Sequence, residues 1–180
     1  MEKHWLWTHP AAPSMAVDGV DFSLERRSAT SLHLRYEVKG RIGELVVPAR
    51  AAPIRTDNLW KTTCFELFLR RARSTAYREL NFSPSSRWAA YEFSAHRRGM
   101  VQAALPAPPV VEVTIGAEQL NVDVRVSLDL ADEPYLLAAA AVIEEKNGRL
   151  SLWALSHAGA APDFHHPDCF RLELPPAPAP

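Results

Sequence analysis

The 180-residue sequence has few cysteines, almost no net charge and no long apolar run, and each shortage excludes a class of protein. Two cysteines, Cys64 and Cys169, are too few for the disulfide framework of a small secreted domain, so we expect reduced thiols buried in strands. Lysine and arginine number 20 against 21 acidic residues, which gives a formal net charge of −1. Without a basic excess to neutralise phosphates, no nucleic-acid partner is expected.

Membrane-spanning and targeting segments are also missing. The most apolar stretch, Tyr135 to Ile143, is too short to cross a bilayer. The first residues, Met1 to Trp5, lack the charged region and the apolar run of a signal peptide. We therefore expect a cytoplasmic protein that has no membrane partner.

Common catalytic and nucleotide-binding motifs are absent as well. The chain contains no G-x-G-x-x-G, no P-loop and no G-x-S-x-G turn. The sequence therefore carries no signature of a dinucleotide, a nucleoside triphosphate or a nucleophilic serine, and we assign no catalytic residue.

Apolar residues, 47% of the chain, recur instead with a period of two. Residues 32–38, 111–115, 120–128 and 170–174 alternate apolar and polar side chains, as strands with one wet face do. Denser apolar runs at 44–47, 65–69, 77–82, 88–93, 136–143 and 150–155 are typical of central strands buried on both faces. The run 136–143, with four consecutive alanines, resembles a helix, but Pro134 and the Asn147-Gly148 turn that flank it favour a strand.

Proline, glycine and asparagine residues separate these runs at short intervals, which is the spacing expected of two packed sheets. The predicted fold is therefore all-β, a two-sheet antiparallel β-sandwich. Residues 1–174 are predicted to form a single domain, since length and apolar content suit one core. Residues 175–180 are Pro/Ala-rich and contain no core residue, so we expect a disordered tail.

The densest polar signal precedes the predicted strand at 65–69. A polar loop brings Arg55, Asp57 and Trp60 close in sequence to Glu66, a single acid among apolar neighbours. A buried carboxylate requires a partner, and Arg55 is the candidate. These residues suit a ligand-binding site, and they suit equally well a loop that is held by its own hydrogen bonds.

A second cluster places Asn81 and Glu92 on two aromatic strands, 77–82 and 88–93. Aromatic residues at this spacing are more typical of a core than of a ligand platform. The two polar side chains would then lie within an otherwise apolar sheet, and a bound ligand is one explanation for them.

The third cluster contains Trp153, His157 and the segment 162–168, in which Asp163, His165, His166 and Asp168 occur. Imidazole and carboxylate groups are good metal ligands. The spacing matches no zinc template, however, and adjacent histidines in a strand point to opposite faces. We therefore predict no metal site here and interpret the histidines as loop or ligand-binding residues.

Several motifs in these clusters occur in a distinctive order along the chain: Arg55-x-Asp57-x-Leu59-Trp60, Cys64-Phe65-Glu66-Leu67-Phe68-Leu69, Asn81-Phe82-Ser83-Pro84, Trp88-Ala89-Ala90-Tyr91, Trp153-Ala154-Leu155-x-His157 and Pro162-Asp163-Phe164-His165. With them the sequence resembles the bacterial DOMON-like proteins from about His9 to Leu174, and more distantly the family-9 carbohydrate-binding modules. The resemblance implies a jelly-roll sandwich with a ligand pocket, in a superfamily whose members bind sugars or haem. In the sugar-binding modules two tryptophans clamp a sugar ring. Trp60 matches one of them, and Trp153 and Trp88 are candidates for the second.

Residues and resemblance together predict a domain that binds a small molecule, with a sugar or a sugar-containing metabolite as the candidate ligand. No cofactor is identified, and catalysis is not expected. The predicted ligand-binding residues are Arg55, Asp57, Trp60, Glu66, Asn81, Trp153, His157 and His165.

Three alternative functions stay open. A hydrolase requires a histidine of the third cluster within hydrogen-bond reach of Glu66, Glu144 or Asp163 in an open cleft. A haem protein requires an axial pair, such as Met15 or Met100 with a histidine. A structural or partner-binding domain would use the polar residues for the fold alone, and would have no cavity with convergent polar groups.

Overall fold

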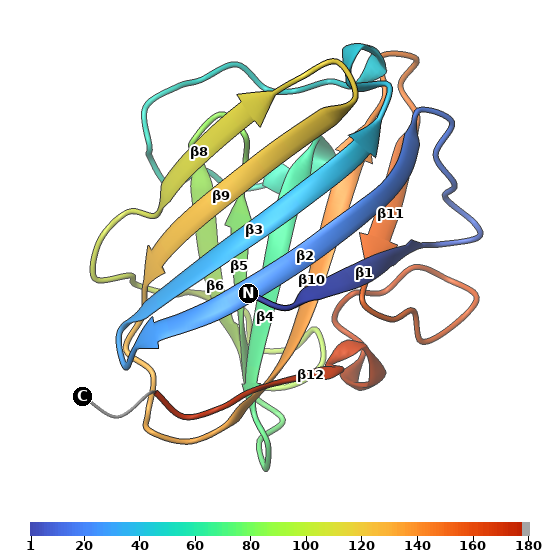
Figure 1. Ribbon diagram of the computed structural model, residues 1–180. Helices are drawn as coiled ribbons and strands as arrows, with labels where there is room; N and C mark the ends of the chain where they lie inside the picture. The colour runs from blue at the N-terminus through green and yellow to red at the C-terminus, as the bar shows by residue number, and fades with distance from the viewer. Residues whose placement is uncertain (178–180) are drawn as a thin grey trace.

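The computed structural model describes residues 1–177, which form twelve β-strands and three short 3₁₀ turns (Figure 1). The elements in chain order are β1 (Lys3–Thr8), β2 (Val17–Ser28), β3 (Ser31–Gly40), η1 (Ile42–Glu44), η2 (Leu59–Lys61), β4 (Cys64–Arg71), β5 (Tyr77–Phe82), β6 (Trp88–Phe93), β7 (Val101–Gln102), β8 (Val110–Ile115), β9 (Gln119–Ser127), β10 (Tyr135–Glu144), β11 (Leu150–Ala154), η3 (Pro167–Cys169) and β12 (Leu172–Leu174). In this part of the chain no helix is long and apolar enough to cross a membrane.

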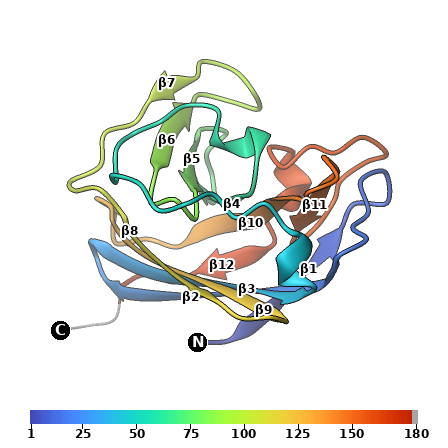
Figure 2. The same ribbon diagram turned by 90° about the horizontal axis from the view of Figure 1, so that it is seen from above.

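The strands pair antiparallel in the order β7-β6-β5-β4-β10-β11-β1-β2-β3-β9-β8. They form two layers, which we call the front sheet (β1-β2-β3-β9-β8) and the curled sheet (β7-β6-β5-β4-β10-β11). Figure 2 shows the two layers edge-on, with the curled sheet rising away from the front sheet toward β6 and β7. The predicted two-sheet antiparallel β-sandwich is confirmed.

Strand β1 joins these layers. Its first four residues, Lys3 to Leu6, pair with β2, whereas Trp7 and Thr8 pair with β11. In the curled sheet, β10 pairs with β4 along most of its length. The other edge of β10 is shared by β12 and then by β11. One end of the sandwich is therefore closed by a continuous hydrogen-bonded chain rather than by two separate sheet edges.

The main core lies between the two sheets and is built by the alternation seen in the sequence. Its members include Phe22, Leu34, Tyr36 and Val122 from the front sheet and Phe65, Leu67, Leu80 and Leu137 from the curled sheet. Tyr36 is fully buried, and its hydroxyl donates a hydrogen bond of 2.7 Å to the backbone carbonyl of Glu66. This bond ties the centre of the front sheet to β4 across the core.

A second apolar cluster covers the opposite face of the curled sheet. It combines strand residues such as Phe68, Tyr77 and Phe93 with Leu59 of η2 and Phe170 beside η3. The alanine run is confirmed as a strand: in β10, residues 138 and 140 belong to this outer cluster, whereas residues 139 and 141 belong to the main core. Small side chains on the outer face of β10 occupy little of the space beneath the covering loops.

The prediction of a central strand at residues 44–47 is wrong. Glu44 ends the turn η1, and Leu45 forms only an isolated bridge with Glu145. The turn carries the chain to the far end of β10, and Pro48 has no backbone N–H with which to extend a ladder. The Asn147-Gly148 turn between β10 and β11 is confirmed, and Gly148 has the positive φ of 85° that such a turn requires.

The structure also differs from the prediction in the first two strands and in the position of Cys169. Strands β1 and β2 were not predicted, although β2 is the longest strand in residues 1–177. Cys169 lies in η3 rather than in a strand, and both cysteines are free and buried as expected. Pro175 accepts a hydrogen bond from Arg26 through its backbone carbonyl, and residues 178–180 of the predicted tail lie outside the described residues.

Candidate functional site

A cavity of about 1020 Å³ opens on the outer face of the curled sheet. Its walls come from the loops that carry residues 57–60, 97–102 and 162–165, together with residues of β4, β5, β6, β10 and β11. The aromatic lining consists of Trp60, Tyr91, Phe93 and Phe164, and the polar lining of Asp57, Asn58, Glu66, Glu79, Arg97, Gln102 and His165. A cavity with apolar walls and a few convergent polar groups is the usual form of a small-molecule site.

Trp60 stands at the wall of this cavity because the short turn η2 holds it there. Asn58 precedes the turn in the left-handed region, with φ of 63°, and Leu59 is buried as an anchor. Trp60 follows Leu59 and keeps 50% of its surface exposed. An indole ring of this size that stays half-exposed inside a cavity is a surface on which an apolar ligand face can stack.

Asp57 is fixed beside this ring by Tyr91 of β6. The Tyr91 hydroxyl donates a hydrogen bond of 2.6 Å to Oδ1 of Asp57. Burial, together with this carboxylate, raises the pKa of Tyr91 well above its usual value. Tyr91 therefore stays neutral and keeps donating, and the second oxygen of Asp57 has no protein donor within the described residues.

Two glutamates form the floor of the cavity. Glu66 on β4 and Glu79 on β5 lie on the outer face of adjacent strands and are only 3% and 6% exposed. Burial raises the pKa of both carboxyl groups, and the charge of Glu79 raises that of Glu66 further. Asn81, which lies opposite Glu66, donates a 2.7 Å hydrogen bond to Glu79.

His165 enters the same cavity from the loop between β11 and β12. Its Nδ1 lies 2.7 Å from the Tyr77 hydroxyl, and its Nε2 lies 3.7 Å from Glu79. Burial, with the nearby charge of Arg97, lowers the pKa of His165 to about 4, so the ring is neutral at physiological pH. Because a carboxyl oxygen faces Nε2, we assign the ring proton to Nε2 and let Tyr77 donate to Nδ1.

Arg97 supplies the positive charge of the cavity wall and is itself held in place. Its guanidinium donates to Asp163 Oδ1 at 2.8 and 3.0 Å, and its backbone N–H donates to the Tyr77 hydroxyl. Arg97 has a positive φ of 54°, a backbone conformation that residues other than glycine rarely adopt. Asn58 and Arg97, which line the cavity from opposite loops, thus both have unusual backbones, a feature that clusters at functional sites.

The structure brings four of the eight predicted ligand-binding residues to the cavity: Asp57, Trp60, Glu66 and His165. Asn81 lies just beneath it, 1% exposed, and acts on Glu79 rather than lining the space. The remaining three, Arg55, Trp153 and His157, lie elsewhere.

Arg55 was expected to pair with Glu66, and this expectation is wrong. Its guanidinium donates to the backbone carbonyls of Ala90 and Ala103 and packs over the rings of Trp88 and Tyr91. Arg55 therefore pins its loop to β6, which is the alternative that the sequence left open. Because it backs the ring of Tyr91, it supports the cavity wall from behind.

Trp153 is buried in the main core, 3% exposed, and its indole N–H donates to the Ser151 hydroxyl. It offers no face to a ligand, because the strand alternation of β11 turns it toward the front sheet. His157 bonds the backbone carbonyl of Trp7 and packs edge-on against His9. It does not line the cavity itself, but its ring lies behind Phe164, which does.

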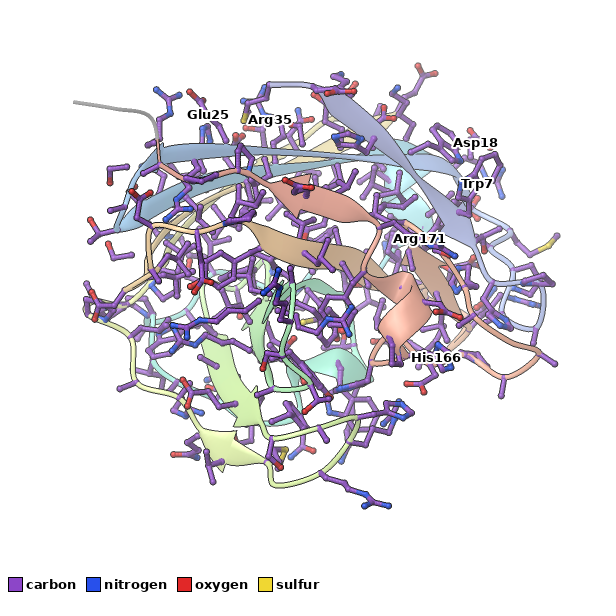
Figure 3. All side chains as sticks on the ribbon, turned by 90° about the horizontal axis from the view of Figure 1, so that it is seen from below. Trp7, Asp18, Glu25, Arg35, His166 and Arg171 are labelled. Atoms are coloured by element: carbon purple, nitrogen blue, oxygen red, sulfur yellow. The ribbon has the colours of Figure 1, made fainter. Side chains whose placement is uncertain are left out.

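Four polar residues of the cavity lining were missed from the sequence: Asn58, Glu79, Arg97 and Gln102. Glu79 could have been found, since the alternation through Tyr77, Glu79 and Asn81 places all three on one face of β5. Arg97 lies in a loop and follows no periodic signal. His166 and Arg171 flank η3 in Figure 3, and His166 caps that turn by accepting the Asp168 N–H. Residues 1–177 contain no group of three or more ligands that could hold a metal ion.

No protein-family model and no curated protein matches the chain. Solved structures do. A candidate carbohydrate-binding protein from Bacteroides uniformis superposes with a TM-score of 0.67 at 14% identity, over 94% of this chain and 84% of its own. A family-9 carbohydrate-binding module from Caldicellulosiruptor kristjanssonii in complex with cellotriose gives 0.55 at 13% identity, over 87% and 73%. The module from the same organism with glucose gives 0.50 at 12% identity, over 85% and 74%. The chain therefore has the sandwich fold of carbohydrate-binding proteins.

Proposed function

We propose that this protein binds a carbohydrate in the cavity on the outer face of the curled sheet. The observation that carries the proposal is the half-exposed ring of Trp60 in a cavity whose floor presents buried carboxyl groups. Sugars have apolar C–H faces and polar rims, so they need an aromatic surface together with hydrogen-bonding groups.

The geometry supports a division of roles among the cavity residues. Trp60 provides the stacking surface, and Asp57 lies beside it with a free oxygen for a hydroxyl group. Glu66 and Glu79 can donate when protonated and accept when ionised. Tyr91 and Asn81 fix the two acids that they bond, so the site is organised before a ligand arrives.

The fold and the sequence motifs support the same proposal. Neighbours of the same fold were solved with cellotriose and with glucose. The motif that contains Asp57 and Trp60 is one of those on which the resemblance to DOMON-like proteins rests. We propose on these grounds that the chain is a member of that group whose ligand is a sugar.

Isothermal titration calorimetry with glucose, cellobiose and cellotriose tests the proposal. Binding of at least one sugar should weaken about tenfold or more in Trp60→Ala, because the stacking surface is lost. Trp7→Ala is the matched control: Trp7, labelled on β1 in Figure 3, is 63% exposed, and it is not among the residues that line the cavity. Equal affinity in the wild type and Trp60→Ala, or no binding of any sugar, would contradict the proposal.

A further inference from the structure

Glu66 is an acidic side chain of the cavity that has no hydrogen-bond donor among the described residues. Glu66 lies on the central strand β4, and only 3% of its surface is exposed. No donor in residues 1–177 hydrogen-bonds its carboxyl oxygens. The group nevertheless lines the cavity, so its oxygens point to the space that a ligand would fill.

Glu79 adds a second carboxyl group next to the first. One of its oxygens accepts a hydrogen bond from Asn81. The other lies 3.7 Å from Nε2 of His165, beyond hydrogen-bond distance, and that ring is neutral. The Asn81 side-chain oxygen, just beneath the floor, is also buried without a partner among the described residues. When Glu66 and Glu79 are ionised, the cavity floor therefore presents acceptors in excess of donors.

The charged groups around the floor also include more acids than cations. The groups that face it from every neighbouring element are Glu66 on β4, Tyr77 and Glu79 on β5, Tyr91 on β6, Arg97 and His96 on the loop after β6, Asp57 before η2, and Asp163 and His165 before η3. Arg97 is the cation of this set, and its guanidinium is bound by Asp163. The acids therefore outnumber the cations that could neutralise them.

We propose that the floor of the cavity binds a primary ammonium group, so that an amino sugar is the preferred ligand of the site. The inference rests on the proposed carbohydrate function and narrows it. An ammonium group has three donors and no acceptor, which complements the unpartnered oxygens of Glu66 and Glu79. A neutral sugar hydroxyl can satisfy only part of this excess.

Binding of an ammonium group must be coupled to a loss of protons from the floor. Burial raises the pKa of both glutamates, so without a ligand they retain protons above the usual range of a carboxyl group. A bound ammonium favours the ionised carboxylates, and the displaced protons pass to solvent. Charge-assisted hydrogen bonds of this kind are stronger than those to neutral hydroxyls.

Calorimetric titration with five probes tests the inference: glucosamine, glucose, N-acetylglucosamine, glucuronate and putrescine. Glucosamine should bind about tenfold or more tightly than glucose at neutral pH. N-acetylglucosamine keeps the nitrogen but loses the charge, so it should lose the advantage. Stacking on Trp60 should contribute equally to glucose and glucosamine, so Trp60→Ala should weaken both alike.

The variant Glu66→Gln/Glu79→Gln should bind glucose and glucosamine with equal affinity, while Glu92→Gln leaves the preference intact. Glu92 is exposed on β6 outside the cavity lining, which makes it a matched control for the same substitution. Single variants, Glu66→Gln and Glu79→Gln, keep the test possible if the double variant does not fold.

The outcomes separate this inference from the proposed function. Glucose binding without a gain for glucosamine overturns the ammonium inference and leaves carbohydrate binding in place. Tighter binding of glucuronate than of glucosamine overturns it too, and makes Arg97 the dominant charge. Binding of glucosamine and putrescine but not of glucose supports the ammonium site and refutes a general sugar site. Absence of binding by all five probes overturns both.

Discussion

Replacement of the two tryptophans, Trp60 and Trp153, should separate binding from stability. Trp153 is 3% exposed within the main core, and Trp153→Ala deletes nearly a whole buried indole. Large-to-small substitutions of this kind cost about 3–5 kcal/mol. In a domain of this size that loss lowers the midpoint of thermal unfolding by roughly 6–20 °C. Trp60 is 50% exposed, so Trp60→Ala forfeits at most about half of that stability.

Thermal and urea unfolding of both variants measures the stability, and a sugar titration of each folded variant measures the binding. We expect Trp60→Ala to fold well and to lose binding. Trp153→Phe, which keeps a ring in the core, should fold and keep its affinity. The assignment would be refuted if Trp60→Ala unfolded as readily as Trp153→Ala, or if Trp153→Phe alone lost the ligand.

Three other predictions follow from buried polar groups. Tyr36→Phe removes the hydrogen bond to the Glu66 carbonyl, so urea unfolding should show a loss of about 1 kcal/mol in the free energy of unfolding. Burial on folding raises the pKa of Glu66 above the ordinary range of a glutamate. The stability contributed by its protonated form is therefore fully present below that ordinary range and is lost as pH rises through the folded pKa. The free energy of unfolding of Glu66→Gln should therefore match that of the wild type near pH 4.5. At pH 9 the variant should be more stable, by about 1.4 kcal/mol for each pKa unit by which folding raises the pKa of Glu66. A variant that is less stable than the wild type at pH 9 would contradict the burial argument. Since the pKa of His165 is about 4, its ring resonances should stay constant in NMR spectra between about pH 6 and 8, and a midpoint near 6.5 would contradict its buried position.

The fold was largely predictable because strand alternation is a local signal. Residues 120–128 alternate strictly, and β9 pairs in the register that puts their apolar side chains in the core. The prediction of a strand at 44–47 failed because the apolar side chains of this segment are buried or half-buried at the end of β10, where the backbone forms only an isolated bridge. Strand β2 was missed even though Val20, Phe22 and Leu24 alternate with polar residues.

The site was only half predictable because it depends on which face each side chain occupies. Trp60 and Glu66 share a short segment with Asp57, so a single local motif identified them. Trp153 belongs to a similar aromatic motif, but the register of β11 turns it to the core. Arg97 reaches the cavity through a loop held by Tyr77 and Asp163, contacts that are distant in sequence and leave no pattern to read.

The most direct test of carbohydrate binding in this cavity is a titration followed by ¹H–¹⁵N NMR of the indole N–H groups. The chain has five tryptophans: Trp60 reports on the cavity, Trp153 on the core, Trp88 on β6, and Trp5 and Trp7, whose ring centroids lie 6.4 Å apart, together report on β1. We expect a bound sugar to shift the Trp60 signal, together with the signals of backbone amides around Asn58 and Arg97, and to leave the signals of Trp7 and Trp153 in place. Shifts centred on Trp7 with an unmoved Trp60 would contradict it.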